Sequence, residues 1–204
     1  HTQLILMKGI GKYEIIGETR DDAAGECFDK AAKILGLGYP GGPIISKIAA
    51  ESRGRPTSTG LPRPMINTKD FDFSFSGLKT AVLYTVRDYQ NRTTDSSMVL
   101  DKEFISQICF EVQQAIIDVL IKKTMNAAKK YKAKTIILGG GVSANQELRK
   151  QFKEKVQELP KVSFLVPEAS LSTDNGLMIA VAASFHQKKK QRWQSLKANA
   201  NLRV

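Results

Sequence analysis

The sequence has few of the residues on which disulfide-stabilised and zinc-dependent proteins are built. Its 204 residues include two cysteines and two histidines. Cys27 and Cys109 lie far apart, each within an apolar helical pattern, so neither a disulfide framework nor a CxxC metal knuckle can be formed. His1 and His186 do not have the spacing of a zinc peptidase pair. The composition therefore indicates a reducing compartment and excludes a zinc peptidase site built from these residues alone.

Long apolar runs and targeting signals are also missing. No uninterrupted apolar run approaches the roughly 20 residues that a bilayer requires, and no secretory signal pattern opens the chain. The segment SGLKT at 76–80 lacks the GxxxxGK[ST] spacing of a phosphate-binding loop. With 42% hydrophobic and 25% charged residues, the composition is that of an ordinary globular protein. These absences argue against membrane spans and against P-loop chemistry.

Apolar periodicity and glycine positions predict a mixed α/β protein. The predicted elements are, in chain order, a hairpin of strands 3–7 and 13–16, helices 24–35, 44–50 and 104–120, strand 135–138, helix 146–158, strand 162–166 and helix 174–185. The pattern at 104–120 is the cleanest amphipathic one; its helix is expected to end in the basic segment 122–134 and to pack against a sheet. Because strands and helices alternate after it, we expect a mixed sheet flanked by helices.

The most informative segment is Gly139–Asn145, GGGVSAN, which follows a predicted strand and opens a helix. Three missing side chains let a ligand lie against the backbone, and amides at a helix start can donate to an anion or a ring nitrogen. A tight strand-to-helix turn is the alternative, but a plain turn does not require the entropy cost of three glycines. We therefore favour a ligand-binding loop in which Asn145 both caps the helix and donates to the ligand.

Two other loops are rich in glycine and proline. The segment 36–43 contains a literal GxGxxG, but it follows a helix, whereas a dinucleotide-binding fingerprint follows a strand. The match therefore does not indicate a Rossmann fold. A rigid loop in which the backbone of Gly42 approaches a ligand is compatible with the pattern, and the second loop, 53–65, is also of a kind that often carries function.

Acidic residues mark the starts of two predicted helices. Asp22, Glu26 and Asp29 are spaced by four and three residues, so they share one helix face. That face is either solvated or binds ribose hydroxyls or a cation, and spacing alone does not decide between these. Asp174 opens the last predicted helix, where an Asp is a common cap and can also be a metal ligand. One acid does not make a metal site.

Positive charge is in excess, with 31 Lys and Arg against 20 Asp and Glu and a formal net charge of +11. It collects in the segments 122–134 and 188–203, neither of which contains an acidic residue. Basic runs are usually solvated faces. An RNA or an acidic protein is the alternative partner, although no RNA-binding aromatic signature interleaves the charges.

Six motifs, in this order, resemble the bacterial TsaD family: HTQL at the start, DDAAGECFDK, GLGYPGGP, DFSFSGLKT, GGGVSAN and TDNGLMIA. The resemblance covers essentially the whole chain. It implies an α/β fold of the actin-like ATPase and sugar-kinase (ASKHA) superfold, in which two ribonuclease-H-like lobes close over a nucleotide. Residues 1–204 are similar to the C-terminal lobe, with a helical insertion at about 44–100.

The family pattern has Ser-Gly-Gly directly before the His-Thr that opens this chain, and the chain does not begin with Met. By resemblance, we expect the first strand of this lobe and the whole N-terminal lobe to be absent from these residues. The resemblance also implies transfer of a threonylcarbamoyl group from threonylcarbamoyl-AMP to N6 of adenosine 37 in tRNAs that read ANN codons. The implied protein partners are the TsaB and TsaE subunits, in the cytoplasm.

The resemblance carries four site residues over to this chain. Asp29 and Gly42 are expected to contact the adenylate or its threonylcarbamoyl portion, and Asn145 is expected to hold the nucleotide. Asp174 is expected to be one ligand of a divalent iron or zinc ion, whose His-x-x-x-His ligands in the family lie on the N-terminal lobe. Because this chain has no such pair, we expect the 204 residues alone to lack transferase activity. No residue is assigned as a catalytic base.

Other classes of function stay open on the sequence. A noncatalytic nucleotide-binding or scaffold subunit of the same complex would share the fold, but it would not need three preserved ligand loops. A sugar or acetate kinase of the same superfold would transfer a phosphoryl group to a small acceptor. A metallopeptidase is the weakest alternative because the chain lacks the ligands.

Overall fold

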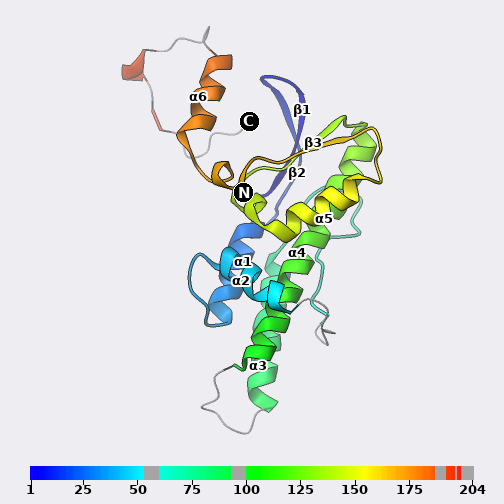
Figure 1. Cartoon of the computed structure of the whole chain (residues 1–204), viewed down its shortest axis with the longest axis vertical. Coiled ribbons are helices and arrows are strands. Elements are labelled where there is room, and N and C mark those ends of the chain that lie inside the picture. Colours follow the sequence, from blue (N-terminus) through cyan, green and yellow to red (C-terminus); the bar gives the residue numbers. More distant parts are fainter. Residues whose placement is uncertain (53–59, 93–99, 187–191, 196, 199–204) are drawn as a thin grey trace.

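A helical half and a strand-containing half share one long helix in this α/β chain (Figure 1). The computed structural model describes residues 1–52, 60–92, 100–186, 192–195 and 197–198. Its helices and strands are β1 (Gln3–Gly9), β2 (Lys12–Glu18), α1 (Ala24–Ile34), α2 (Gly41–Glu51), α3 (Ser76–Arg92), α4 (Lys102–Tyr131), β3 (Thr135–Ile137), α5 (Gln146–Val156), β4 (Ser163–Leu165) and α6 (Gly176–Phe185). Short 3-10 turns cover Gly141–Ala144, Ala169–Leu171 and Trp193–Ser195.

The strands β1 and β2 form the predicted antiparallel hairpin, and its turn uses Gly11 at a φ of 75°. A third segment docks beside β2, since Thr19 and Phe73 form a parallel bridge. Gly17 makes this approach possible, because a Cβ there would lie 2.2 Å from the carbonyl oxygen of Phe71. The hairpin is thus fixed to the chain that leads into α3.

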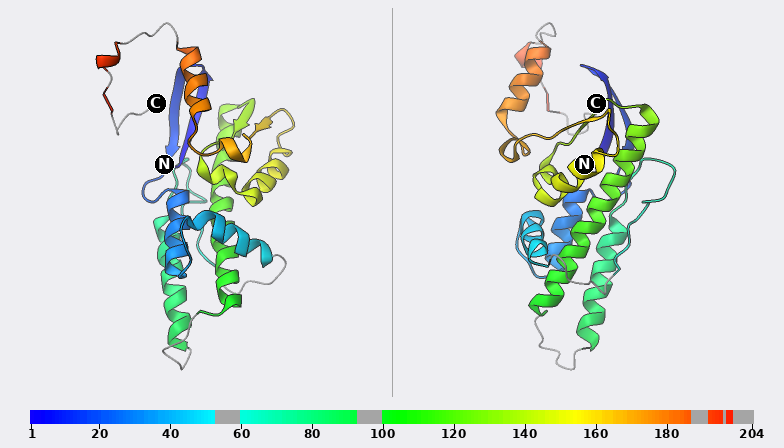
Figure 2. Two further views of the ribbon diagram at one scale, coloured as in Figure 1. Left: turned by 60° about the vertical axis from the view of Figure 1, so that its left-hand side comes forward. Right: turned by 45° about the vertical axis from the view of Figure 1, so that its right-hand side comes forward.

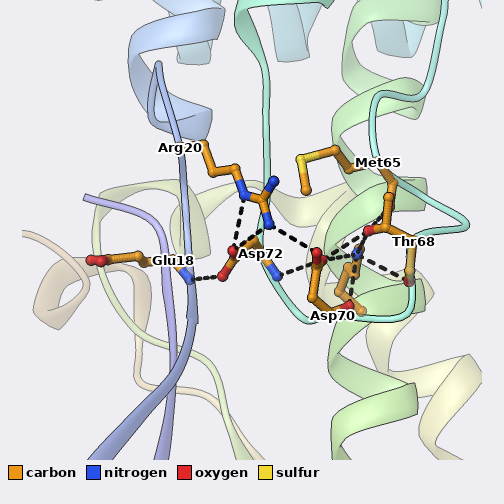
Figure 3. A network of polar contacts seen from close by, with 7 residues as sticks. Glu18, Arg20, Met65, Thr68, Asp70 and Asp72 are labelled. Atoms are coloured by element: carbon orange, nitrogen blue, oxygen red, sulfur yellow. Dashed lines mark hydrogen bonds and ion pairs between the residues drawn. The ribbon is translucent and has the colours of Figure 1, made fainter.

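Charged side chains hold the same segment against α4 (Figure 3). The ammonium of Lys123 on α4 donates to the hydroxyl of Thr68 at 2.6 Å and to the carbonyl oxygen of Asp70 at 2.9 Å. Arg20, just after β2, pairs with Asp70 at 2.9 Å and with Asp72 at 3.0 Å. One short loop therefore connects the end of the hairpin with the second half of the long helix.

The start of α3 is capped from a distance by Asp21. Its Oδ1 accepts the backbone N–H of Phe75 at 2.8 Å and of Ser76 at 3.1 Å, and its Oδ2 accepts the hydroxyls of Ser74 and Ser76. Partial burial acts to raise the pKa of Asp21, but these hydrogen bonds outweigh it and lower the pKa to about 2. The carboxylate satisfies amides that a helix start otherwise leaves unpaired.

The helix α4 ends at Tyr131, inside the basic segment 122–134 where the sequence placed its end. Lys132, in the left-handed region at a φ of 51°, terminates it. The prediction of a solvated basic run is wrong at one position: Lys123 is fully buried, since its ammonium finds the acceptors described above. By length and composition α4 could cross a membrane, but its most apolar window is 61% buried, as in a core helix.

Two apolar clusters lie along α4. The larger one packs α1, α2 and α3 against its first half, and these four segments are the helical half of the molecule. Cys27, Phe75 and Ile108 are fully buried there. The smaller one packs the second half of α4 against β3 and α5, with Ile136 and Phe152 among its members. The pattern 104–120 was expected to pack against a sheet, but most of this range contacts helices, and the cluster that includes β3 begins only at Ile117 (Figure 2).

The strands form two separate sheets among the described residues, not the single mixed sheet that the sequence suggested. The second sheet contains β3 and β4, paired in parallel from Thr135 opposite Ser163 to Ile137 opposite Leu165. The other edge of β1 and the other edge of β3 have no strand partner in the described ranges. One sheet is antiparallel and the other is parallel, as a mixed sheet requires, but no strand among the described residues joins them.

Two sequence expectations fall wholly or largely outside the described residues. The loop 53–65 is described only from Gly60 onward, and most of the basic segment 188–203 is not described. The preceding helix, α6, stands apart from α1 to α5 in both figures (Figure 1, Figure 2). None of its ten residues is buried.

Candidate functional site

The loop after β3 has the free space that a ligand-binding backbone requires. A Cβ placed on Gly139, Gly140 or Gly141 would meet no atom within 4 Å. Only Gly140, at a φ of 82°, needs glycine for its backbone conformation. Packing in the described chain therefore gives no reason for glycine at the other two positions, which favours the ligand-loop interpretation over a plain turn.

Asn145 ends this loop and begins α5. Its Oδ1 accepts the backbone N–H of Leu148 at 2.9 Å, so the predicted helix cap is confirmed. Its Nδ2 donates to Oε1 of Gln113 on α4 at 2.8 Å. Gln113 is itself buried, so the side chain of Asn145 is held in one orientation. Whether the amide also donates to a ligand stays a prediction.

A cavity of about 190 Å³ lies beside the glycine loop. It is lined by the first residues of the chain, 1–4, by 136–143 from β3 and the loop, and by mostly apolar side chains of α4 and α5. The hydroxyl of Ser143 is buried and has no hydrogen-bond partner among the described residues. A buried hydroxyl without a partner costs free energy, so this position is one that an incoming polar group would stabilise.

The residues Asp29 and Gly42 lie where α1 meets α2. The carboxylate of Asp29 accepts the backbone N–H of Gly41, the first residue of α2, at 2.7 Å. Gly41 is where two backbones approach closely, because a Cβ there would lie 2.6 Å from Cβ of Ala32. A Cβ on Gly42 would meet only Cβ of Phe28, at 3.9 Å. The close helix contact thus belongs to Gly41, and a ligand contact at Gly42 stays a prediction.

The acidic face predicted on α1 is divided between two partners. Lys30 pairs with Asp22 at 2.6 Å and with Glu26 at 2.7 Å, whereas Asp29 points to α2. Hydrogen bonds to these two carboxylates raise the pKa of Lys30 above its usual value. Two of the three carboxylates are therefore neutralised by a neighbouring ammonium, and no cation site is formed by the three together.

Asp174 is exposed, and its carboxylate makes no hydrogen bond or ion pair with a described residue. The helix α6 begins two residues later, and Asn175 caps it by accepting the N–H of Met178 at 3.0 Å. The prediction that Asp174 starts this helix is therefore wrong, because the amide side chain takes the capping position. Among the described residues, no group of three His, Cys, Asp or Glu side chains is placed to hold a metal ion. Asp174 thus fits a metal only as one ligand of several.

Two sets of contacts link the segments that carry the predicted site residues. The glycine loop touches the start of α1, where a Cβ on Gly25 would lie 3.3 Å from Val142, and Asp29 is one turn further along that helix. Arg149 on α5 bonds both to the glycine loop and to the segment before Asp174. The sequence reasoning missed Arg149, although its position four residues after Asn145 puts both on one helix face.

The two thiols take no part in such a site. Cys27 and Cys109 are both free and buried in the larger apolar cluster. Burial raises the pKa of each thiol to about 12. Because the thiolate is the nucleophile, neither side chain is reactive at neutral pH.

Comparison with known proteins identifies the family of this chain. A family model described as "TsaD: tRNA N6-adenosine threonylcarbamoyltransferase" matches residues 1–181. The chain belongs to the TsaD family. The matched range contains Asp29, Gly42, Asn145 and Asp174, so all four TsaD site predictions lie within it.

Several curated proteins with the TsaD transferase name are similar over nearly the whole chain. The protein of Geobacillus kaustophilus is 44% identical over 203 residues, which is 99% of this chain and 56% of that protein. That of Desulfotalea psychrophila is 48% identical over 186 residues, which is 91% of this chain and 52% of that protein. The Thermosipho africanus protein is 42% identical over 207 residues, 100% of this chain and 58% of its own length. The chain thus spans a little more than half of these TsaD relatives.

Proposed function

We propose that this chain is the C-terminal lobe of a protein that makes threonylcarbamoyladenosine in tRNA. The full-length protein would transfer a threonylcarbamoyl group from threonylcarbamoyl-AMP to N6 of adenosine 37 in tRNAs that read ANN codons. The TsaD match over residues 1–181 supports this, and so does the loop with open space at all three glycines. The relatives are named for this transferase activity.

Three side-chain or backbone groups would bind the adenylate. The open backbone of Gly139–Gly141 and the held amide of Asn145 would donate to the nucleotide, as helix-start amides do to anions. One oxygen of Asp29 is committed to Gly41, and its Oδ2 has no hydrogen-bond partner among the described residues. That oxygen would accept a ligand hydroxyl beside Gly42. Together these groups would fix the mixed anhydride for attack by a weakly nucleophilic amine.

Asp174 would supply one ligand to a divalent iron or zinc ion, with His ligands outside these residues. Its exposed and unpaired carboxylate fits that role, whereas the described residues offer no complete set. Such an ion would act as a Lewis acid toward the anhydride oxygens. We assign no catalytic base to this chain.

The open edges of the two sheets support the lobe assignment. The cavity beside the glycine loop lies between the start of β1 and the end of β3, and neither strand has a partner on its other edge in the described ranges. An extended segment placed there would pair with both edges and would join the two sheets into one mixed sheet, as in the ASKHA superfold. We propose that a strand preceding His1 in the full-length protein takes this place.

The tRNA would be attracted by lysines around the end of α4. Lys129, Lys132, Lys134 and Lys161 are exposed and form no ion pair with a described carboxylate. Lys161 lies close to this group, since the N–H of Ser163 donates to the carbonyl oxygen of Lys134 at 2.9 Å. Unpaired cations on one surface are what a phosphate backbone requires.

The test of the lysine surface is a double substitution, Lys132→Glu with Lys134→Glu, in the full-length protein. We expect weaker tRNA binding and a salt dependence whose slope falls by about one per lysine removed. Lys47→Glu, an exposed charge on α2, is the matched control. Equal tRNA affinity in all three proteins would place the tRNA elsewhere.

The activity itself is tested with purified TsaB, TsaE, threonylcarbamoyl-AMP and tRNA in a cytoplasm-like reducing buffer. We expect modified tRNA with the full-length protein and none with the 204 residues alone. Asn145→Ala is expected to lower adenylate affinity by at least tenfold. Unchanged activity after loss of adenylate binding would instead favour the noncatalytic scaffold class, and phosphoryl transfer to a small acceptor would favour a kinase.

A further inference from the structure

Arg149 on α5 connects the two segments that carry Asn145 and Asp174. Its Nε donates to the carbonyl oxygen of Ser143 in the glycine loop, and its Nη2 donates to Oγ of Ser172 at 2.9 Å. Ser143 and Ser172 each lie two residues before a predicted ligand residue. One side chain therefore spans the distance between the two proposed binding segments.

Both contacts are shielded from water. Ser143 is 1% exposed and Ser172 is 5% exposed, although Asp174, two residues on, is exposed. The hydroxyl of Ser172 also donates to the carbonyl oxygen of Glu168 at 3.2 Å. Ser172 is thus the buried anchor of an otherwise exposed turn, and Arg149 is the side chain from outside the turn that holds it.

The chemistry of the guanidinium suits a spacer with fixed geometry. Arg149 forms no ion pair with a described carboxylate, and the two acceptors named above are both neutral oxygens. A planar guanidinium presents its N–H groups at fixed angles, so two simultaneous bonds set the relative placement of the two acceptors. Arginine also lies over the turn that precedes it in a helix, which here is the glycine loop.

We propose that Arg149 is a positioning residue that fixes the loop of Asn145 and the segment of Asp174 relative to each other. It acts through its two neighbours and does not touch the substrate. This inference rests on the proposed function, because it gives Asn145 and Asp174 their ligands. A substrate held at one segment and an ion held at the other meet in productive geometry only when this spacing is maintained.

The test uses the full-length protein with Arg149→Ala, Arg149→Lys and Asp174→Ala. Lys150→Ala is the matched control, since Lys150 is the exposed neighbour on α5 and its weak contact, 3.9 Å to Glu154, involves neither segment. Amide hydrogen exchange measures the order of 139–145 and 168–175. Competition with a chelator measures the affinity for zinc.

We expect Arg149→Ala to speed exchange in these two segments alone and to weaken zinc binding by about tenfold, the lower end of the loss caused by removing a direct partner of a metal ligand, because Arg149 contacts Ser172 and not Asp174 itself. Arg149→Lys should recover only part of the affinity, because an ammonium lacks the fixed fork. The Lys150→Ala protein should match the parent in both measurements.

Unchanged zinc affinity in Arg149→Ala, together with its loss in Asp174→Ala, would overturn the inference, and so would faster exchange throughout the chain. If Asp174→Ala itself retains zinc, the proposed metal role is wrong. In that case the exchange at 139–145 and 168–175 still decides whether Arg149 links the two segments.

Discussion

The apolar side chains of the helical half are buried, whereas those of α6 are exposed. Phe75 and Ile108 in the helical half are 0% exposed, whereas Ile179 and Phe185 on α6 are 64% and 59% exposed. Both regions have sequences that favour burial, and α6 is apolar on all sides. A helix of that kind belongs in a core. The elements of the helical half therefore bury one another, whereas the apolar surface of α6 is not buried by any described residue. Exposed apolar surface of this kind is typical of a contact with another part of a protein or with a partner.

The largest expected effect comes from opening the closed core. Phe75→Ala removes a fully buried ring, and we expect a loss of about 3–5 kcal/mol in the free energy of unfolding. Phe185→Ala in α6 should change it by less than about 0.5 kcal/mol. Urea unfolding of the 204-residue chain measures both. Similar losses from the two variants would mean that α6 is buried in solution, and the contrast would disappear.

A smaller effect is expected where α1 and α2 touch. Gly41→Ala places a methyl group 2.6 Å from Cβ of Ala32 and 2.9 Å from the carbonyl oxygen of Phe28. Such overpacking costs about 1–3 kcal/mol. Gly42→Ala has room for its methyl group and should be neutral for stability. Thermal unfolding compares the two variants, and an equally stable Gly41→Ala would show that the helices can separate.

The cap of α3 predicts a pH dependence of stability that originates in the helical half. The pKa of Asp21 is lowered to about 2 in the folded chain, whereas an unfolded Asp titrates near about 3.9. Its stabilisation is therefore present above about pH 4 and is lost as the pH falls toward 2. The carboxylate is largely exposed, so about 1 kcal/mol is the upper expectation.

Asp21→Asn removes this dependence, and Asp88→Asn, an exposed position on α3, is the control. Circular dichroism during acid titration of the two variants measures it. A parent whose stability between pH 4 and 2 equals that of Asp21→Asn would contradict the assigned hydrogen bonds.

The smallest effect is expected from thiol reagents. Because burial raises the pKa of Cys27 and Cys109 to about 12, the native chain should be labelled only through opening of the core. Mass spectrometry after brief exposure to a maleimide should find unlabelled protein, and urea should allow two labels. Fast native labelling would show that the helical half opens more readily than its burial indicates.

Local features of the sequence predicted most of the elements. The hairpin, α1 and the cap at Asn145 follow from turn glycines, apolar spacing and a capping side chain, which act over a few residues. The burial of Lys123 was missed, because it depends on acceptors more than 50 residues away. Distant acceptors of this kind leave no mark in local periodicity.

In the candidate site, too, the local features were predicted and the long-range contacts were not. The glycine loop was found from its three glycines, and its open space agrees with that hypothesis. The ligand contact predicted at Gly42 stays a prediction, and the close helix contact at Gly41 was not foreseen because it depends on how α1 packs against α2. The single mixed sheet was expected from alternating elements, but pairing needs neighbouring edges, and β1 and β3 are not paired in the described ranges. The hydrogen bond from Arg149 to Ser172 joins residues 23 positions apart, so only the folded structure reveals it.

The placement of α4 has a consequence for how the chain folds. Ile116 belongs to the larger apolar cluster and Ile117, the next residue, belongs to the smaller one. A helix is propagated cooperatively, so neighbouring turns form and melt together. The two clusters are therefore joined by the backbone of one continuous helix, and loss of either removes support from the other. We expect them to unfold in a single transition, with the amides at the middle of α4 exchanging last.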